Sequence, residues 1–259
     1  IMAQYSLSAL FTYPSVKTLA RVSPHHMLVA GSLLMAIYFG ILSSAQITTA
    51  SLILLAVIWA LQHAVYWPTF HYIFSLARTK EHGNTQVAGL DALVIIAHTI
   101  APAIGGIVAT IFGIQYTYYV VVAILFVAGL PMLNRNQGPE TIKSSFSFAQ
   151  IRKINRDLWA NMAHSTVFIS ESVLWPLFVF LIVSSYAGVG ALSSVIAISS
   201  MGVTLFVGRR SEKRGEHPYI NHGVATYGIG NIARALAQNA THIFGVNLLS
   251  GIGKSLYHA

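Results

Sequence analysis

Apolar residues run in long stretches along most of the chain, and polar residues gather between these stretches. A helix needs about 20 apolar residues to cross the hydrocarbon core of a bilayer. Measured against that length, the sequence predicts a short opening helix followed by eight longer ones. They are expected over 1–13, 25–43, 50–76, 85–113, 115–133, 157–183, 187–207, 219–238 and 241–256. The pattern therefore predicts an all-α, polytopic membrane protein.

Composition excludes the other broad classes of protein. Charged residues are 8% of the chain, apolar residues are 55%, and the mean hydropathy is +0.65. Soluble proteins carry about 25% charged residues, so this chain could not cover a soluble surface. Disordered chains are poor in apolar residues, which excludes disorder. The 259 residues contain no cysteine, so they hold no disulfide or thiolate metal site.

Basic residues occupy every second connection between the predicted helices. The connections 43–49, 113–117, 184–190 and 239–241 contain no lysine or arginine. Basic connections stay in the cytoplasm, so this alternation predicts the topology. The basic connections and helix ends hold Lys17, Arg21, Arg78, Lys80, Arg135, Lys143, Arg152, Lys153, Arg156, Arg209, Arg210, Lys213, Arg214 and Lys254. The net charge of +8 thus indicates orientation in a cytoplasmic or plasma membrane, and no nucleic-acid partner is expected.

One long polar connection divides the predicted helices into two groups. The prediction is an N-terminal bundle over 1–133, a cytoplasmic linker over 134–156 and a C-terminal bundle over 157–259. The chain starts and stops beside apolar runs, and its first helix enters from the outside. We therefore interpret it as a fragment from the second to about the tenth helix of a longer protein.

Two segments have the spacing of helix-contact or gating motifs. One is Gly208-x-x-x-Glu212-Lys213-x-Gly215 in a basic connection. The other lies in the helix 85–113, where small residues and a proline recur at Ala97, Ala101, Pro102, Gly105 and Gly106. Small residues let two helix backbones approach, and proline permits bending. Each segment also has a plainer interpretation, as a basic loop that sets topology and as a well-packed kinked helix.

With the two halves and the alternating charges, these segments resemble the major facilitator superfamily of secondary transporters. The first is similar to that family's loop signature Gly-x-x-x-Asp-Arg-x-Gly-Arg-Arg, with Glu212 and Lys213 replacing Asp and Arg. The second is similar to Gly-x-x-x-Gly-Pro-x-x-Gly-Gly, with Ala97 and Ala101 replacing two glycines. The matching first-half loop, 13–21, keeps almost none of the signature. The resemblance implies two pseudo-symmetric bundles, alternating access, and a gating latch at 208–217.

Ionisable residues inside spanning segments are costly, which makes them functional candidates. Glu171 lies mid-helix in a long apolar run, shortly before Trp175 and Pro176. A buried carboxylate without a partner is unfavourable, so we expect Glu171 to be neutral or transiently paired, as a proton carrier requires. The alternative is a structural carboxyl bonded to a neighbouring Ser, His or Tyr. Asp91 is nearer the cytoplasmic end of its helix, where Arg78 or Lys80 would neutralise it.

Further polar candidates lie on two other helices. In the helix 50–76, Gln62 and Tyr66 share one face while His63 and Trp67 share the adjacent one with His71. By resemblance this helix lines the central cavity, where aromatic rings stack on a substrate and Gln62 and His63 hydrogen-bond it. The alternatives are an interfacial Trp67 and a capping His71. Asn247 is a candidate pore-facing group. Arg234 is deep enough to need an acidic or carbonyl partner, which the sequence does not identify.

The predicted function is secondary transport of a small molecule by alternating access, coupled to protons, with efflux by antiport as one form. The expected partners are membrane lipids, the substrate and protons, and the expected state is a monomer without cofactor, metal or catalytic residues. The alternative is a membrane enzyme or assembly factor on the same scaffold, which the degenerate first-half loop favours. The sequence does not indicate the substrate or the direction of transport.

Overall fold

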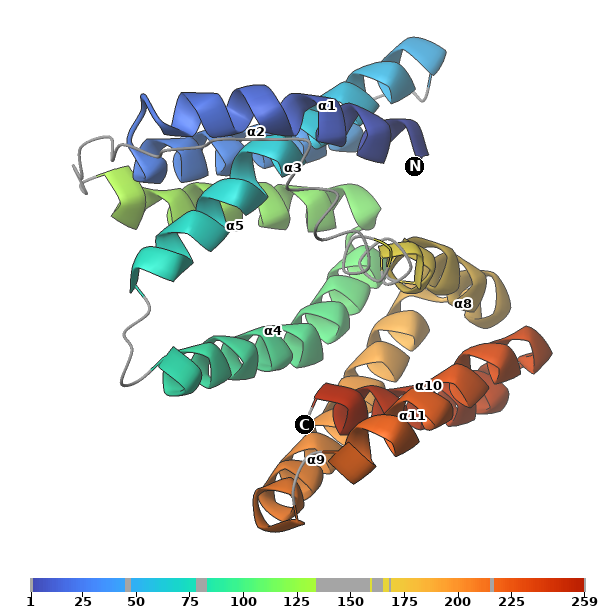
Figure 1. The fold of residues 1–259 in the computed structure, drawn as a ribbon. Coiled ribbons are helices and arrows are strands. Elements are labelled where there is room, and N and C mark those ends of the chain that lie inside the picture. The colour runs from blue at the N-terminus through green and yellow to red at the C-terminus, as the bar shows by residue number, and fades with distance from the viewer. Residues whose placement is uncertain are drawn as a thin grey trace. The chain divides into compact units, whose positions relative to one another are not determined.

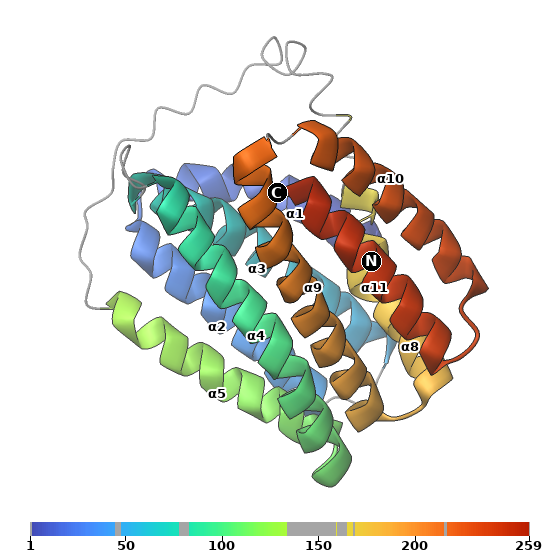
Figure 2. The same ribbon diagram turned by 90° about the horizontal axis from the view of Figure 1, so that it is seen from below.

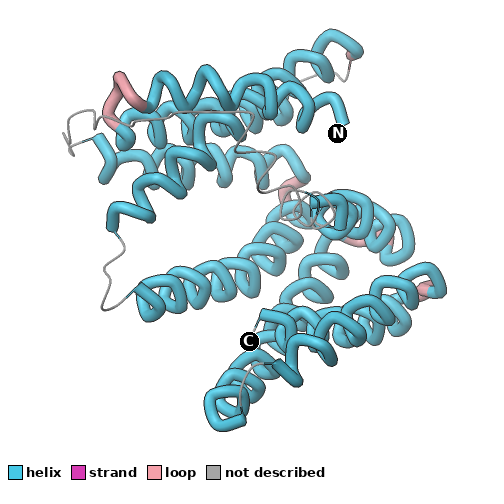
Figure 3. The backbone as a smooth tube through the Cα atoms, in the orientation of Figure 1, coloured by secondary structure: helices cyan, strands magenta, loops and turns pink. Residues whose placement is uncertain are grey.

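The computed structural model describes residues 2–44, 48–77, 83–133, 159, 165–167, 169–214 and 217–258. These residues are almost entirely helical, and Figure 3 shows helices joined by short connections. The elements are α1 (Met2–Leu19), α2 (Pro24–Ser44), α3 (Thr49–Ala77), α4 (Gly83–Ile111), α5 (Ile114–Leu133), the π-helical turn η1 (Ser170–Leu174), α8 (Trp175–Val183), α9 (Tyr186–Arg214), α10 (His217–Ala233), the 3₁₀ turn η2 (Arg234–Leu236) and α11 (Ala240–His258). The predicted all-α fold is confirmed.

Five segments among the described residues are long and apolar enough to cross a membrane. They are Pro24–Ser44, Thr49–Ala77, Leu93–Ile111, Ile114–Leu133 and Ser165–Val183. Large apolar side chains are exposed along them, and none of the apolar window in Ile114–Leu133 is buried within the protein. A surface of this kind is compatible with lipid and not with water, which fits the polytopic membrane class.

The helix boundaries depart from the predicted ones mainly where a helix leaves the apolar region. α9 continues to Arg214, although its apolar run stops near 207. Arg, Lys and Glu are good helix formers, so the polar tail extends the helix without needing burial. In the opposite sense α10 stops at Ala233 and gives way to η2, earlier than the predicted end at 238. Hydropathy predicts where the helices lie, because residues exposed to lipid must be apolar. It does not predict where a helix ends, because a helix can stop within an apolar run or continue into polar residues.

The described helices fall into two compact units. The first contains α1, α2, α3 and α5, and the second contains α8, α9, α10, α11 and most of α4, from Val87 onward. α4 therefore groups with helices that follow the connection 134–156 in the sequence. Neither unit is one contiguous segment of the chain. α4 lies between α3 and α5 in the sequence, but most of it belongs to the second unit.

In the first unit α2 lies between α3 and α5, and α1 packs on α3 (Figure 1). The rings of Phe39 and Tyr118 stack across α2 and α5 with centroids 5.8 Å apart. α2 and α3 approach closely at Gly31, where an added Cβ would lie 2.9 Å from the Cβ of Tyr66. This packing leaves the other faces of these apolar helices for lipid.

In the second unit α10 and α11 run side by side in both Figures 1 and 2, and α11 also contacts α8 and α9. Their shared core contains Val179, Ala237 and Ile243. Trp175 packs against the edge of this core. The core thereby fixes the end of η1, the residues after η2 and the start of α11 relative to one another.

Candidate functional site

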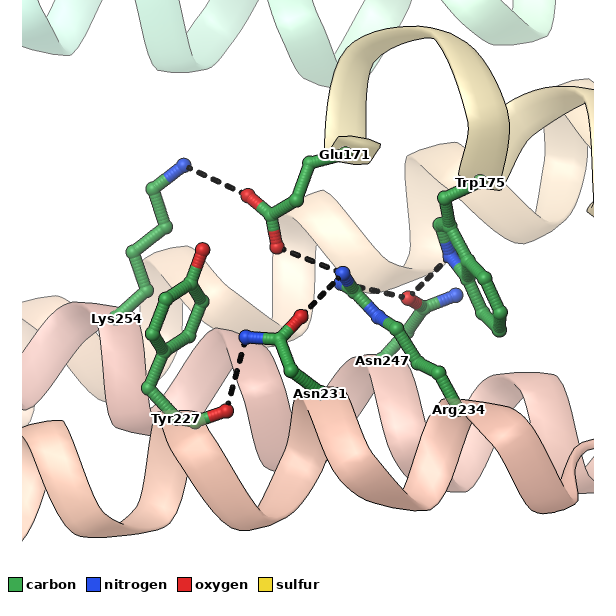
Figure 4. Close-up of polar contacts among 7 residues, drawn as sticks. All are labelled: Glu171, Trp175, Tyr227, Asn231, Arg234, Asn247 and Lys254. Atoms are coloured by element: carbon green, nitrogen blue, oxygen red, sulfur yellow. Dashed lines mark hydrogen bonds and ion pairs between the residues drawn. The ribbon is translucent and has the colours of Figure 1, made fainter. Parts of the chain in front are cut away.

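The second unit contains a cluster of charged side chains that starts with an ion pair (Figure 4). Glu171 Oε1 lies 2.9 Å from Arg234 Nη1, and Lys254 Nζ lies 3.7 Å from Glu171 Oε2. The Arg234 and Glu171 side chains are only 14% and 17% exposed, whereas that of Lys254 is 52% exposed. The cluster is thus a mostly buried ion pair with a second, accessible cation beside it.

Neutral side chains hold the guanidinium of Arg234 in place. Its Nη1 donates to Asn231 Oδ1 at 2.7 Å, and its Nη2 donates to Asn247 Oδ1 at 3.4 Å. Trp175 Nε1 donates to the same Asn247 oxygen at 2.8 Å, and the Trp175 ring lies 4.8 Å from the guanidinium carbon. That distance is within cation–π range. Arg234 is therefore oriented by two amides and one indole as well as by Glu171.

Glu171 is presented by the π-helical turn η1. The N–H of Trp175 donates to the carbonyl of Ser170, five residues earlier. Pro176 has no N–H, so an ordinary α-helical bond from that position cannot form, and the helix changes pitch just before it. Such π turns are rare and often occur at functional sites. The Trp175-Pro176 pair therefore accounts for the local geometry that carries Glu171.

Two polar stripes meet where α10 packs on α11. Along α10 and into η2, the stripe is Tyr227, Asn231 and Arg234, and along α11 it is Asn247, Ser250 and Lys254. Residues three, four and seven positions apart share a helix face. Gly253 leaves room for the Tyr227 backbone, and Gly230 leaves room for Ser250. The close approach of the two backbones brings the stripes together around Glu171.

The structure brings together three of the predicted pathway residues, Glu171, Trp175 and Asn247. Glu171 is expected from the sequence to be neutral or transiently paired, and in the structure it is paired with Arg234 and approached by Lys254. The sequence showed that Arg234 needed a partner but could not identify one so far along the chain. The sequence alone places Lys254 among the basic residues at helix ends that set the topology. Sequence analysis also missed Asn231 and Tyr227, although the spacing of both to Arg234 on one face was a usable signal.

The other predicted pathway residues lie in the first unit, on α3. His63 Nδ1 and Ser8 Oγ of α1 are 3.2 Å apart, and the His63 ring stacks on Trp59 with centroids 4.9 Å apart. His63 and Trp67 are in ring contact at 6.2 Å, in agreement with the predicted shared face. Gln62 is 7% exposed and Trp67 is 43% exposed. The α3 candidates therefore do not form one surface: Gln62 is buried, Tyr66 faces Gly31 of α2, and Trp67 is open.

The predicted small-residue motif on α4 contacts α9 closely at Pro102 and Gly106. Gly106 leaves room for the backbone of Tyr186, and Gly190 leaves room for the carbonyl of Pro102. The N–H of Ala187 donates to Thr110 Oγ1 at 3.1 Å. Ala97 and Ala101 are exposed, and Gly105 is half-buried. The tight helix contact thus involves Pro102 and Gly106.

The predicted gating residues are only partly described. Gly208, Glu212 and Lys213 belong to the last turns of α9. Only the backbone is described there, so the positions of the Glu212 and Lys213 side chains are outside the described part of the chain. Gly215 is outside the described residues altogether, as are Arg78 and Lys80. The side chain of Asp91 is also outside them. The latch and the neutralisation of Asp91 remain predictions.

The fold and the buried charges define a polytopic helical membrane protein with a mostly buried ion pair, of which Glu171 lies in a candidate span. The family model of the Major Facilitator Superfamily matches residues 1–259. The chain therefore belongs to this family of secondary transporters and is an integral, multi-pass membrane protein. The resemblance drawn from the sequence is confirmed. No curated protein sequence matches the chain.

Proposed function

We propose that this transporter couples the movement of a small molecule to protons by alternating access, with the Glu171–Arg234 ion pair as the coupling element. The observation that carries the proposal is the 2.9 Å contact between these two mostly buried charges. Glu171 lies in the candidate span Ser165–Val183. An ionisable pair at that depth is costly and marks an ion or substrate pathway.

A proton changes what the pair can do. While Glu171 is ionised, it holds Arg234 and attracts Lys254. A proton on Glu171 removes the negative charge and leaves both cations without a counter-ion, so the protonated and ionised forms favour different arrangements of the surrounding helices. In transporters of this kind two helical bundles rock around a midplane site. The proton would bias that movement.

Efflux by proton antiport is a second form of the proposal. It is supported by the resemblance of the α4 segment 97–106 to a signature that the family's drug/proton antiporters carry at this place. In the structure this segment approaches α9 closely at Gly106. The two forms differ in the direction in which protons accompany the substrate. A pH-sensitive dye inside vesicles distinguishes them, because symport acidifies and antiport alkalinises the compartment that the substrate enters.

The test compares Glu171→Gln with the unmodified intact protein in vesicles, using a transported compound found by screening. Glutamine fixes the neutral form, so accumulation driven by a pH gradient should be lost while exchange of labelled for unlabelled compound continues. Ser172→Ala on the same turn is the control and should change neither. Equal loss of accumulation and exchange, or loss of neither, contradicts the coupling role.

A further inference from the structure

The charged cluster has an excess of positive charge. Among the described residues around Glu171, the charged or titratable groups are Arg234 from η2, Lys254 from α11 and Tyr227 from α10, whose side chain faces Glu171 (Figure 4). A phenol is uncharged near neutral pH. The one carboxylate therefore balances one of the two cations while it is ionised, and neither of them once it is protonated.

This excess of positive charge favours an anion at the cluster. A mostly buried cation without a counter-ion is costly, so a negative ligand beside Arg234 removes that cost once Glu171 is protonated. The half-exposed Lys254 adds to the attraction for such a ligand. Because binding free energies are reciprocal, a proton that strengthens anion binding is itself bound more tightly when the anion is present. Proton and anion would then be favoured together at this site.

The donors around the cluster suit a carboxylate. A guanidinium presents its N–H groups as a planar fork that matches two carboxylate oxygens, and Arg234 Nε is buried without a hydrogen-bond partner among the described residues. Lys254 adds a half-exposed ammonium group. Trp175 supplies aromatic surface beside the guanidinium, and the Phe178 ring stacks on Trp175 with centroids 5.5 Å apart. A ligand with a carboxylate at one end and an apolar remainder would therefore have the two cations for its carboxylate and the aromatic rings for its apolar part.

We propose that the substrate is a small organic carboxylate that moves together with a proton and competes with Glu171 for Arg234 and Lys254. This inference rests on the proposed coupling role of Glu171. It specifies symport and a substrate class, neither of which follows from membership of the family. If the substrate competes with Glu171 for the two cations, removing the negative charge of Glu171 should strengthen substrate binding.

Binding is tested on the purified intact protein in detergent, by its melting temperature followed through tryptophan fluorescence. The probes are benzoate and pentanoate, each with its neutral amide and its amine counterpart. The carboxylates should raise the melting temperature, and the amides and amines should not. Stabilisation by the amines, equal stabilisation by the amides, a response to inorganic phosphate or sulfate alone, or no response to the carboxylates overturns the proposal.

Variants separate this inference from the proposed function. Glu171→Gln should bind the effective carboxylate at least about fivefold more tightly than the unmodified protein. Lys254→Gln keeps the ion pair and should bind about fivefold more weakly, whereas Ser172→Ala should not change the affinity. If Glu171→Gln does not fold, the double variant Glu171→Gln/Arg234→Gln removes both charges and should fold without binding carboxylates. If Glu171→Gln binds carboxylates more tightly but still accumulates substrate in response to a pH gradient, the coupling role alone is rejected. If Glu171→Gln loses that accumulation but the protein does not bind carboxylates, the substrate class alone is rejected.

Discussion

At the scale of the residue, Arg234 depends on Glu171 as much as Glu171 depends on Arg234. The guanidinium is buried, and its neutral neighbours orient it without cancelling its charge. Removing one partner of a buried pair leaves an uncompensated charge, at a cost of about 3–5 kcal/mol, whereas removing both charges is often neutral. The pair should therefore show strong non-additivity.

We predict that Arg234→Gln and Glu171→Gln each lower the melting temperature of the intact protein in detergent, and that the double variant melts above either single variant. The physical reason is that the double variant has no unpaired charge in the pair. The measurement is a double-mutant cycle on melting temperatures. Additive losses would mean that the contact between Glu171 and Arg234 contributes nothing to stability, and would contradict their pairing.

At the scale of the element, the site depends on how closely α10 approaches α11. An added Cβ at Gly253 would lie 2.6 Å from the Cα of Tyr227, which is backbone and cannot turn away. The helices would have to separate, and the polar stripes that surround Glu171 would move apart with them. This contact explains why a residue without a side chain lies next to Lys254.

We predict that Gly253→Ala lowers stability by about 1–3 kcal/mol, the usual cost of overpacking, and weakens binding at the cluster. Gly245→Ala on the same helix is the matched control, because nothing lies within 4 Å of its added Cβ. There the better helix propensity of alanine should leave stability unchanged or raise it by up to about 1 kcal/mol. Melting temperatures of the two variants make the comparison, and equal losses would show that the cause is not the contact with Tyr227.

The positions of the helices could be predicted from the sequence, whereas the contacts between them could not. Apolar stretches located the helices because lipid exposure requires them, and a candidate span carried Glu171 in its polar turn. The end of α9 at Arg214 was not predicted, because a polar helix tail has no hydropathy signal. The pairing of Glu171 with Arg234 was not predicted either, because it depends on the packing of η1 against η2 and α11. Periodicity places residues on one face of a helix but does not choose the facing helix.

At the scale of the whole molecule, the orientation in the membrane follows from the connections and not from the cluster. Basic residues alternate between connections, and the positive-inside rule places the basic ones in the cytoplasm. The connection at 113–117 and the one at 184–190 are predicted to face the other side. Gln115, in the first turn of α5, and Ser185, just before α9, are both exposed.

We predict that Gln115→Cys and Ser185→Cys react with a membrane-impermeant maleimide applied from outside, whereas Asn136→Cys in the predicted cytoplasmic linker reacts only after permeabilisation. These 259 residues contain no cysteine, so each substitution adds the only thiol in this part of the protein. Ser185→Cys is nearly isosteric, and Gln115→Cys on the same predicted side is its control. The two outer positions should agree with each other and differ from Asn136. Labelling of all three from one side would contradict the topology, because an odd number of membrane crossings is predicted between Asn136 and each of the other two positions.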